Sequence, residues 1–193
     1  MRCSTVKSVF GILVFSLLVH ASGMPGVWLD VPFVKQEKNG CGAASIAMVM
    51  QYWQRQQSGA PVIPDASEIQ KTLYSAEAKG ILASEMEHYL KEHGFRVFVF
   101  TGRLDDLQQH IAKGRPLIVA LKPSTGSRAL HYVVIAGFDS GAGIVLKNDP
   151  AERKLLRQSF KDFEHEWQAT GNWTLLAVPL ETPTVATYPA ASR

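Results

Sequence analysis

Four residues of this 193-residue chain have side chains suited to acyl transfer on a thiol: Gln36, Cys41, His131 and Asp149. An imidazole can take the proton of a thiol, and the resulting thiolate can attack a carbonyl carbon to give an acyl-enzyme. A carboxylate can hold that imidazole, and an amide can donate a hydrogen bond to the developing oxyanion. We therefore interpret Cys41 as a candidate nucleophile, His131 as its base, Asp149 as the group that orients the ring and Gln36 as an oxyanion donor.

Cys41 stands where a loop gives way to a helical pattern. Apolar residues recur at three- and four-residue steps from Ala43 to Gln56, which predicts an amphipathic helix with Cys41 at its N-terminus. The positive end of a helix favours a thiolate over a thiol, so this position lowers a cysteine pKa. Gly40 and Gly42 would permit a tight turn and the close approach of a substrate. A buried, inert cysteine is the alternative interpretation.

His131 opens an apolar strand-like run, and Asp149 lies just beyond a second one. We expect strands over 131–137 and 143–147, joined by a turn. Antiparallel pairing of these strands would bring the start of the first near the end of the second. Asn148 could hold the imidazole in place of Asp149, but successive strand residues face opposite sides, so only one of the two should point at the ring.

The other patterns place helices before most of the strands. Helices are predicted over 67–74, 84–93 and 104–113, and further strands over 96–101, 116–121 and 173–179. Ser84 is predicted to cap its helix, with Glu87 at the capping-box position. Helices followed by an antiparallel sheet indicate an α+β protein and not a doubly wound α/β protein.

The first residues have the pattern of a secretory signal peptide. Arg2 and Lys7 precede the apolar stretch Val9–Val19, and small residues suited to a signal peptidase follow over 21–23. The apolar stretch is shorter than the roughly 20 residues that a permanent membrane span needs. We expect an exported protein, periplasmic or extracellular, with no stable membrane insertion after cleavage.

Cleavage would remove residues 1–23 and leave one domain over residues 24–180, followed by a disordered tail over residues 181–193 that has too little apolar content to pack. Cys3 would leave with the signal, so Cys41 could form no internal disulfide. The formal net charge of +3 would also fall, because the signal carries two positive charges and no negative ones. A near-neutral domain without a Lys/Arg stripe predicts no nucleic-acid partner.

Several segments together carry a resemblance to a known family. They are Val31–Gln36, Asn39–Met50, Gly94–Phe95, Leu104–Leu121, His131–Gly137 and Asn148–Pro150. In this order they resemble the bacteriocin-processing, double-glycine-leader cysteine peptidases, and more closely the free-standing secreted relatives of that family. The resemblance covers most of the predicted domain.

What the resemblance implies is a papain-like fold, in which a helical half with the nucleophile packs on an antiparallel sheet half with the base. By the same resemblance, Cys41 would be the nucleophile, His131 general base and acid, Asp149 the orienting residue and Gln36 the oxyanion donor. The substrate would be a peptide or protein, and no metal or organic cofactor would be needed. Transporter-linked members process leaders on the cytoplasmic side, so the export signal departs from their pattern.

Three functions fit these residues. The first is a peptidase that hydrolyses peptide bonds, and the second is a transpeptidase or amide-transfer enzyme in which an amine replaces water. The third is a catalytically silent module that binds peptide or glycan, since a fold does not fix a function. A binding module has no chemical need for Gln36, Cys41, His131 and Asp149 together, which favours the first two. The oligomeric state and the specificity are not determined by these patterns.

Overall fold

The computed structural model describes residues 26–56, 63–123 and 130–180. Its helices are α1 (Cys41–Gln54), α2 (Ala66–Leu73), α3 (Ala83–Glu92), α4 (Leu104–Ala112) and α5 (Phe160–Gln168). Its strands are β1 (Val27–Trp28), β2 (Phe95–Thr101), β3 (Leu117–Leu121), β4 (His131–Asp139), β5 (Ile144–Asn148), β6 (Leu156–Ser159) and β7 (Trp173–Pro179). The predicted signal peptide over 1–23 and the predicted tail over 181–193 lie outside the described residues. None of these five helices is long and apolar enough to cross a membrane.

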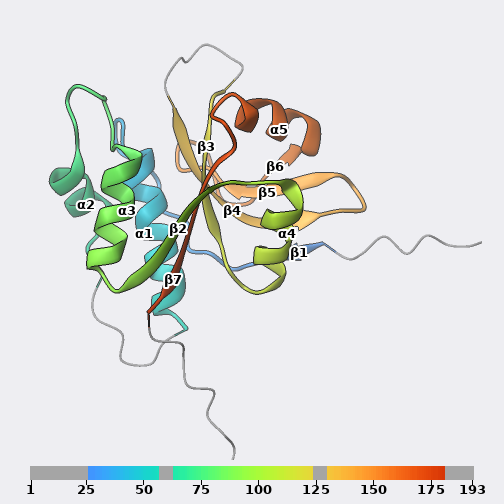
Figure 1. Cartoon of the computed structure of the whole chain (residues 1–193), viewed down its shortest axis with the longest axis horizontal. Helices are drawn as coiled ribbons and strands as arrows, with labels where there is room; N and C mark the ends of the chain where they lie inside the picture. The colour runs from blue at the N-terminus through green and yellow to red at the C-terminus, as the bar shows by residue number, and fades with distance from the viewer. Residues whose placement is uncertain (1–25, 57–62, 124–129, 181–193) are drawn as a thin grey trace, which may run out of the picture.

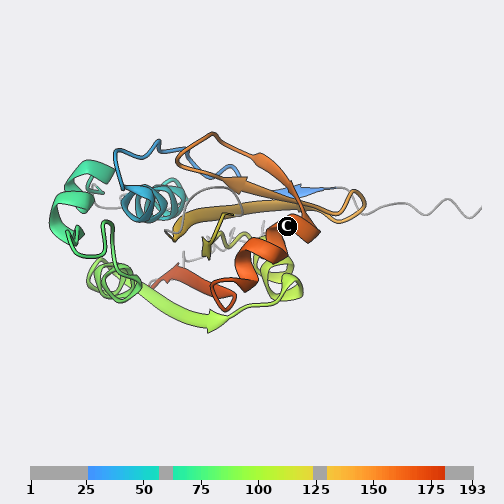
Figure 2. The same cartoon turned by 90° about the horizontal axis from the view of Figure 1, so that it is seen from above.

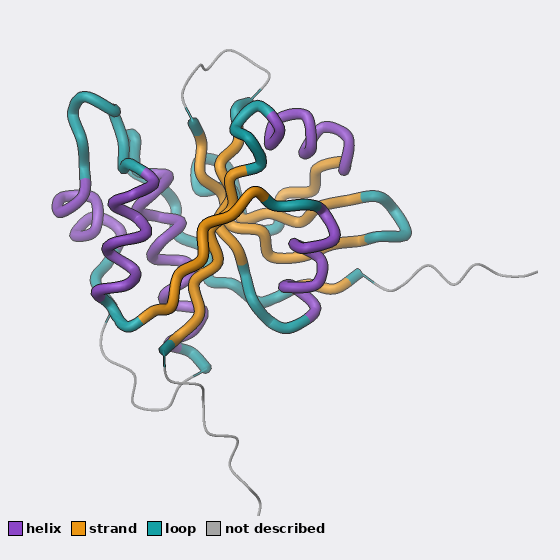
Figure 3. Tube along the Cα trace, viewed as in Figure 1, coloured by secondary structure: helices purple, strands orange, loops and turns teal. Residues whose placement is uncertain are grey.

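The described strands form one antiparallel sheet in the order β2-β7-β3-β4-β5-β6, and β1 pairs with the far end of β4 (Figure 1). Helices α1, α2 and α3 gather on one side of the sheet, while α4 and α5 lie on the other (Figure 3). Seen from above, the sheet curves, so that β2 and β6 lie at opposite edges of the molecule (Figure 2). This arrangement confirms the predicted α+β fold.

Strands β3 and β4 lie at the centre of the sheet and are covered on both faces. Val133 and Ile135 of β4 pack toward α4 and α5, whereas Tyr132 and Val134 pack toward α1. Strands covered on both faces read as continuous apolar runs instead of alternating ones, which explains the apolar sequence after His131. The start of β4 is therefore held firmly from both sides.

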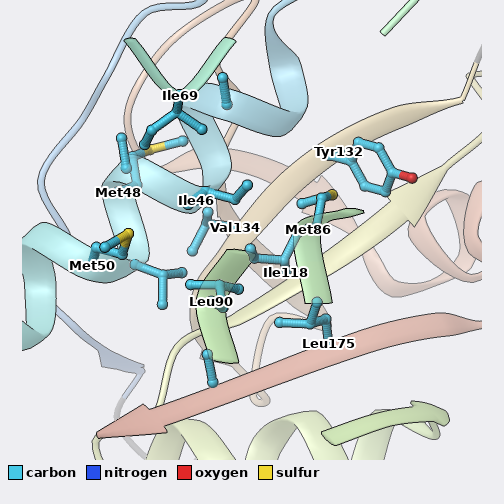
Figure 4. Packing of buried hydrophobic residues seen from close by; sticks show 14 of the residues in the cluster. Ile46, Met48, Met50, Ile69, Met86, Leu90, Ile118, Tyr132, Val134 and Leu175 are labelled. Carbon is cyan, nitrogen blue, oxygen red and sulfur yellow. The ribbon is translucent and has the colours of Figure 1, made fainter. Parts of the chain in front are cut away.

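Helix α1 packs against the sheet through one large apolar cluster. Ile46 and Met50 of α1 meet Leu90 of α3, Val134 of β4 and Leu175 of β7, all nearly inaccessible to solvent (Figure 4). Burying an aliphatic side chain of this size stabilises a fold by about 1.5–3 kcal/mol. The packing fixes the first residue of α1 relative to the first residue of β4.

The N-terminus of the helix agrees with the sequence prediction at α1 but not at α3. The prediction that Ser84 caps α3 is wrong, because the helix begins at Ala83 and its N-cap, Leu82, makes no side-chain capping bond. The neighbouring Ile81 is buried, and anchoring it starts the helix before Ser84 is reached. A capping box does occur at α2, where the Asp65 carboxylate accepts from the backbone N–H of Glu68 at 2.9 Å.

The sequence pattern did not predict β1 or β6. Strand β1 has two residues, and β6 has four with only one aliphatic side chain among them. Neither is long enough to show an alternating pattern of its own. Both strands exist because a longer neighbour, β4 or β5, offers free backbone hydrogen-bonding groups along its edge.

Candidate active site

Three elements bring Cys41, His131 and Asp149 to one cleft. Cys41 is the first residue of α1, His131 is the first residue of β4, and Asp149 directly follows β5. Strands β4 and β5 are antiparallel neighbours, so the start of one lies beside the end of the other, as predicted. The cleft has a volume of about 870 Å³, and Gln36 also lines it.

The imidazole of His131 is hydrogen-bonded to Asp149. Its Nε2 lies 2.7 Å from Oδ1 of the carboxylate, which also accepts the backbone N–H of Ala151 at 3.1 Å. Burial raises the pKa of Asp149, but the hydrogen bond and charge of His131 and the charge of Lys147 outweigh it, so the pKa lies below its ordinary value. An ionised carboxylate only accepts, hence Nε2 carries the proton and Nδ1 is left for the thiol.

Asn148 faces the opposite side of β5. Its Nδ2 donates to the carbonyl oxygens of Val31 at 3.2 Å and Pro32 at 3.4 Å, and its Oδ1 accepts from the backbone N–H of Leu155 at 2.9 Å. The alternation of strand residues thus separates the two neighbours as expected. Asp149 points at the imidazole, and Asn148 fastens the segment that leads to Gln36.

Cys41 is a partly buried free thiol that lines the same cleft as His131. Burial raises the pKa of Cys41. Hydrogen bonds from His131 and from the backbone N–H groups of Tyr132 and Gly42, together with the charge of His131, lower the pKa by more than burial raises it. The net effect is a pKa below the ordinary value of a thiol. The structure therefore favours a thiolate at this helix N-terminus.

The pKa of His131 moves the other way. Burial lowers it, but hydrogen bonds to Asp149 and Cys41 and the charges of both outweigh burial and raise the pKa to about 9. Cys41 and His131 titrate as a coupled pair, so the two shifts describe one equilibrium. Both shifts favour a thiolate beside an imidazolium, the form of the site that can attack a carbonyl carbon.

Gln36 is tied to the same region through its backbone. Its N–H donates to the carbonyl oxygen of Pro150 at 2.9 Å, which fastens the loop before α1 to the segment after Asp149. Its side chain lines the cleft with Cys41, and its Oε1 is buried without a hydrogen-bond partner in the described part of the chain. This oxygen can accept a hydrogen bond from a donor that enters the cleft.

The two glycines beside Cys41 are required by packing, which corrects part of the sequence interpretation. A Cβ on Gly40 would meet the end of the Gln70 side chain and would lie 3.2 Å from the backbone N and O of Glu37, and a Cβ on Gly42 would lie 3.1 Å from the Cβ of Ile81. The left-handed residue of the turn is Asn39, with φ of 59°, and not Gly40. The glycines let α2 and the segment before α3 close on the nucleophile loop.

Sequence reasoning missed Lys147, which lines the cleft and is almost fully buried. Its Nζ lies 3.6 Å from Oδ2 of Asp149. The sequence contained a signal for Lys147, because residues two apart on a strand share a face and Lys147 lies two positions before Asp149. Within the described residues no cluster of three or more His, Cys, Asp or Glu side chains could hold a metal ion.

A protein-family model described as the Peptidase C39 like family matches residues 28–175, which include Gln36, Cys41, His131 and Asp149. No curated protein matches the chain.

The structure resembles solved structures of the same kind. A chain described as a C39-like peptidase from Bacillus anthracis aligns with a TM-score of 0.65 and 17% identity, over 82% of this chain and 100% of that one. The peptidase domain of Streptococcus ComA, a bifunctional ABC transporter involved in quorum sensing, aligns with a TM-score of 0.61 and 22% identity, over 77% and 98%. A double glycine motif protease from an AMS/PCAT transporter, in complex with its leader peptide, aligns with a TM-score of 0.59 and 22% identity, over 79% and 94%. At these identities the likeness is one of fold.

Proposed function

The chain belongs to the peptidase C39-like family, and from this premise we propose that it is an exported cysteine peptidase that hydrolyses peptide bonds through an acyl-enzyme on Cys41. The observation that carries the proposal is the His131 ring, which is hydrogen-bonded to Asp149 and lines the same cleft as the Cys41 thiol at one end of the sheet. A histidine with only a structural role needs neither a thiol partner nor a raised pKa. This arrangement is the one that thiol acyl transfer requires.

In the first step, the Cys41 thiolate attacks the carbonyl carbon of the substrate. The carbonyl oxygen becomes an oxyanion, for which the backbone N–H of Cys41 and the side-chain amide of Gln36 are the proposed donors. The position of Gln36 in the lining of the cleft that holds Cys41 supports this role. The imidazolium of His131 then gives its proton to the leaving amine as the C–N bond breaks, and the acyl group stays on sulfur.

In the second step, a water molecule attacks the thioester carbon while His131 takes a proton from that water. The C–S bond breaks, the carboxylic acid product leaves, and the thiolate and imidazolium are restored. Asp149 stays ionised throughout, and its bond to Nε2 keeps Nδ1 turned toward sulfur. No redox partner or metal ion enters this scheme.

The proposed substrate is a peptide or an exported protein segment. One structural relative was solved with its leader peptide, which supports a peptide in the cleft here. The proposed location, periplasmic or extracellular, rests on the signal-like pattern over residues 1–23. Intact mass and N-terminal sequencing of the exported protein would test it, and a mature chain that still begins at Met1 would contradict it.

Alkylation kinetics test the site. The rate of iodoacetamide labelling of Cys41 should stay high from below neutral pH upward, and His131→Ala should remove that reactivity toward acid pH. Wild type should then cleave members of a peptide library that Cys41→Ala leaves intact. Slow labelling that does not depend on His131 would refute the proposed nucleophile.

Product analysis in the presence of an added amine separates hydrolysis from transfer. Carboxylic acid products at all amine concentrations support the peptidase. Amide products that dominate at low amine concentration would instead make the protein a transferase on the same acyl-enzyme. Peptide binding without any turnover by a reactive Cys41 would leave only a binding module.

A further inference from the structure

We propose that Lys147 is a positioning residue of this active site: its ammonium group holds the second oxygen of Asp149 and keeps that carboxylate ionised and aimed at His131 at the acid end of the working pH range. The inference rests on the proposed function, since it concerns the same Cys41–His131 pair. It adds a second cation to a site that needs only one for the chemistry itself.

The contacts divide the two oxygens of the Asp149 carboxylate between different partners. Oδ1 accepts the imidazole Nε2 of His131 at 2.7 Å and the backbone N–H of Ala151 at 3.1 Å. Oδ2 faces the ammonium of Lys147, at 3.6 Å from Nζ. A carboxylate held on both oxygens cannot rotate away from the ring without losing one of these contacts.

The burial of Lys147 makes its ion pair with Asp149 stronger than a pair on the surface. Only 7% of the Lys147 side chain and 5% of the Asp149 side chain are exposed. A surface ion pair contributes little, but a buried one is shielded from solvent, and removing one partner leaves an uncompensated charge. A lysine that served only solubility would extend its ammonium group into water.

The position of Lys147 follows from the strand. Lys147 pairs with Ile135 of β4 and Leu156 of β6, so it is an inner residue of β5 and not an end residue free to swing out. Its side chain shares a strand face with Asp149, two residues later. The geometry therefore brings Lys147 to the carboxylate side that His131 does not occupy.

Other charged groups also face this site. The groups that line the same cleft are Cys41 of α1, Lys79 before α3, His131 of β4, Asp149 and Glu152 after β5, and Glu166 of α5. Lys79 and Glu152 are exposed, so solvent screens them. Of the two lysines in the cleft, Lys147 is the buried one, and its charge stabilises the ionised carboxylate of Asp149.

The test is the pH profile of Cys41 alkylation in Lys147→Met, a variant of similar length without the charge. The Asp149 carboxylate loses a cation and protonates more readily, so we expect the acid limb to move up by about half to one pH unit. Lys147→Arg retains a cation and should bring the acid limb back toward the wild-type position. Lys154→Met is the matched control, because it removes the same charge from a surface pair with Asp30, and its profile should coincide with that of wild type.

If the acid limb of folded Lys147→Met coincides with that of wild type, the proposed role of Lys147 is wrong. The proposed function still stands in that case if alkylation of Cys41 depends on His131. If alkylation of wild-type Cys41 does not depend on His131, both proposals are wrong. If Lys147→Met does not fold, the wild-type protein still decides the question through the ¹⁵N resonance of Lys147 Nζ. We expect that resonance to shift at the midpoint of the acid limb, and a resonance that does not respond would contradict the role.

Discussion

Replacing Asp149 by Asn should move the basic limb of the pH profile of kcat/KM to lower pH. Burial lowers the pKa of His131, and the hydrogen bonds and charges of Asp149 and Cys41 together raise it from 6.5 to about 9. That difference corresponds to about 3 kcal/mol in favour of the imidazolium. Because Asp149 holds the ring at 2.7 Å and is ionised, we assign it at least half of this preference. The basic limb of Asp149→Asn should therefore fall by about one to two pH units.

The assay is kcat/KM for a cleaved peptide as a function of pH, because acylation needs the imidazolium proton for the leaving amine, whereas alkylation needs only the thiolate. Asp139→Asn is the matched control, since Asp139 lies at the other end of β4 and pairs with Arg157 near the surface. Circular dichroism should establish that each variant is folded. A folded Asp149→Asn protein whose basic limb stays near that of wild type would refute the electrostatic reasoning.

The same substitution has a consequence for stability. The folded pKa of His131 is raised, so its coupling to Asp149 stabilises the fold fully below the ordinary value of 6.5 and is lost as the pH rises through about 9. The folded pKa of Asp149 is lowered, so its contribution is present above the ordinary value of 3.8 and is lost as the carboxylate protonates. The loss of unfolding free energy in Asp149→Asn should be largest between these two ordinary values, as urea unfolding across that range would measure.

Three further substitutions give distinct results. His131→Ala should raise the pKa of Cys41 toward that of an ordinary thiol, and unchanged alkylation in mildly acid buffer would contradict the ion pair. Gln36→Ala should lower kcat by about 10²–10³-fold while Cys41 alkylates as before, because only the oxyanion donor is lost; an unaltered kcat would exclude that role. Gly40→Ala should lower the melting temperature, because its Cβ would lie 3.2 Å from the backbone N and O of Glu37 and would displace the Gln70 side chain from its hydrogen bond to Lys38. Gly143→Ala, where nothing lies within 4 Å but φ is positive, separates this crowding from backbone strain.

Much of the fold could be predicted from local patterns. The helix at Cys41 and the strand Trp173–Pro179 begin at the residues predicted, because long apolar periodicities are read directly from the chain. The misplaced cap at Ser84 and the missed strands β1 and β6 have the opposite cause. Their positions depend on the burial of Ile81 and on the free edges of longer strands, which no short window of sequence contains.

The sequence alone determined the residue types of the site and the order of the elements that carry them: a thiol at a helix N-terminus, an imidazole at a strand start, and a carboxylate after the next strand. The tertiary structure decided which groups meet. His131 and Asp149 are 18 residues apart in the chain, and their contact depends on the register of β4 and β5, which shifts between Ile135 and Gly137. Alternation allows either Asn148 or Asp149 to face the ring, and only the packing of both faces of the sheet turns Asp149 toward His131 and buries Lys147 beside it. The physical reason is that periodicity is a local property, whereas register and burial are set by segments distant in sequence.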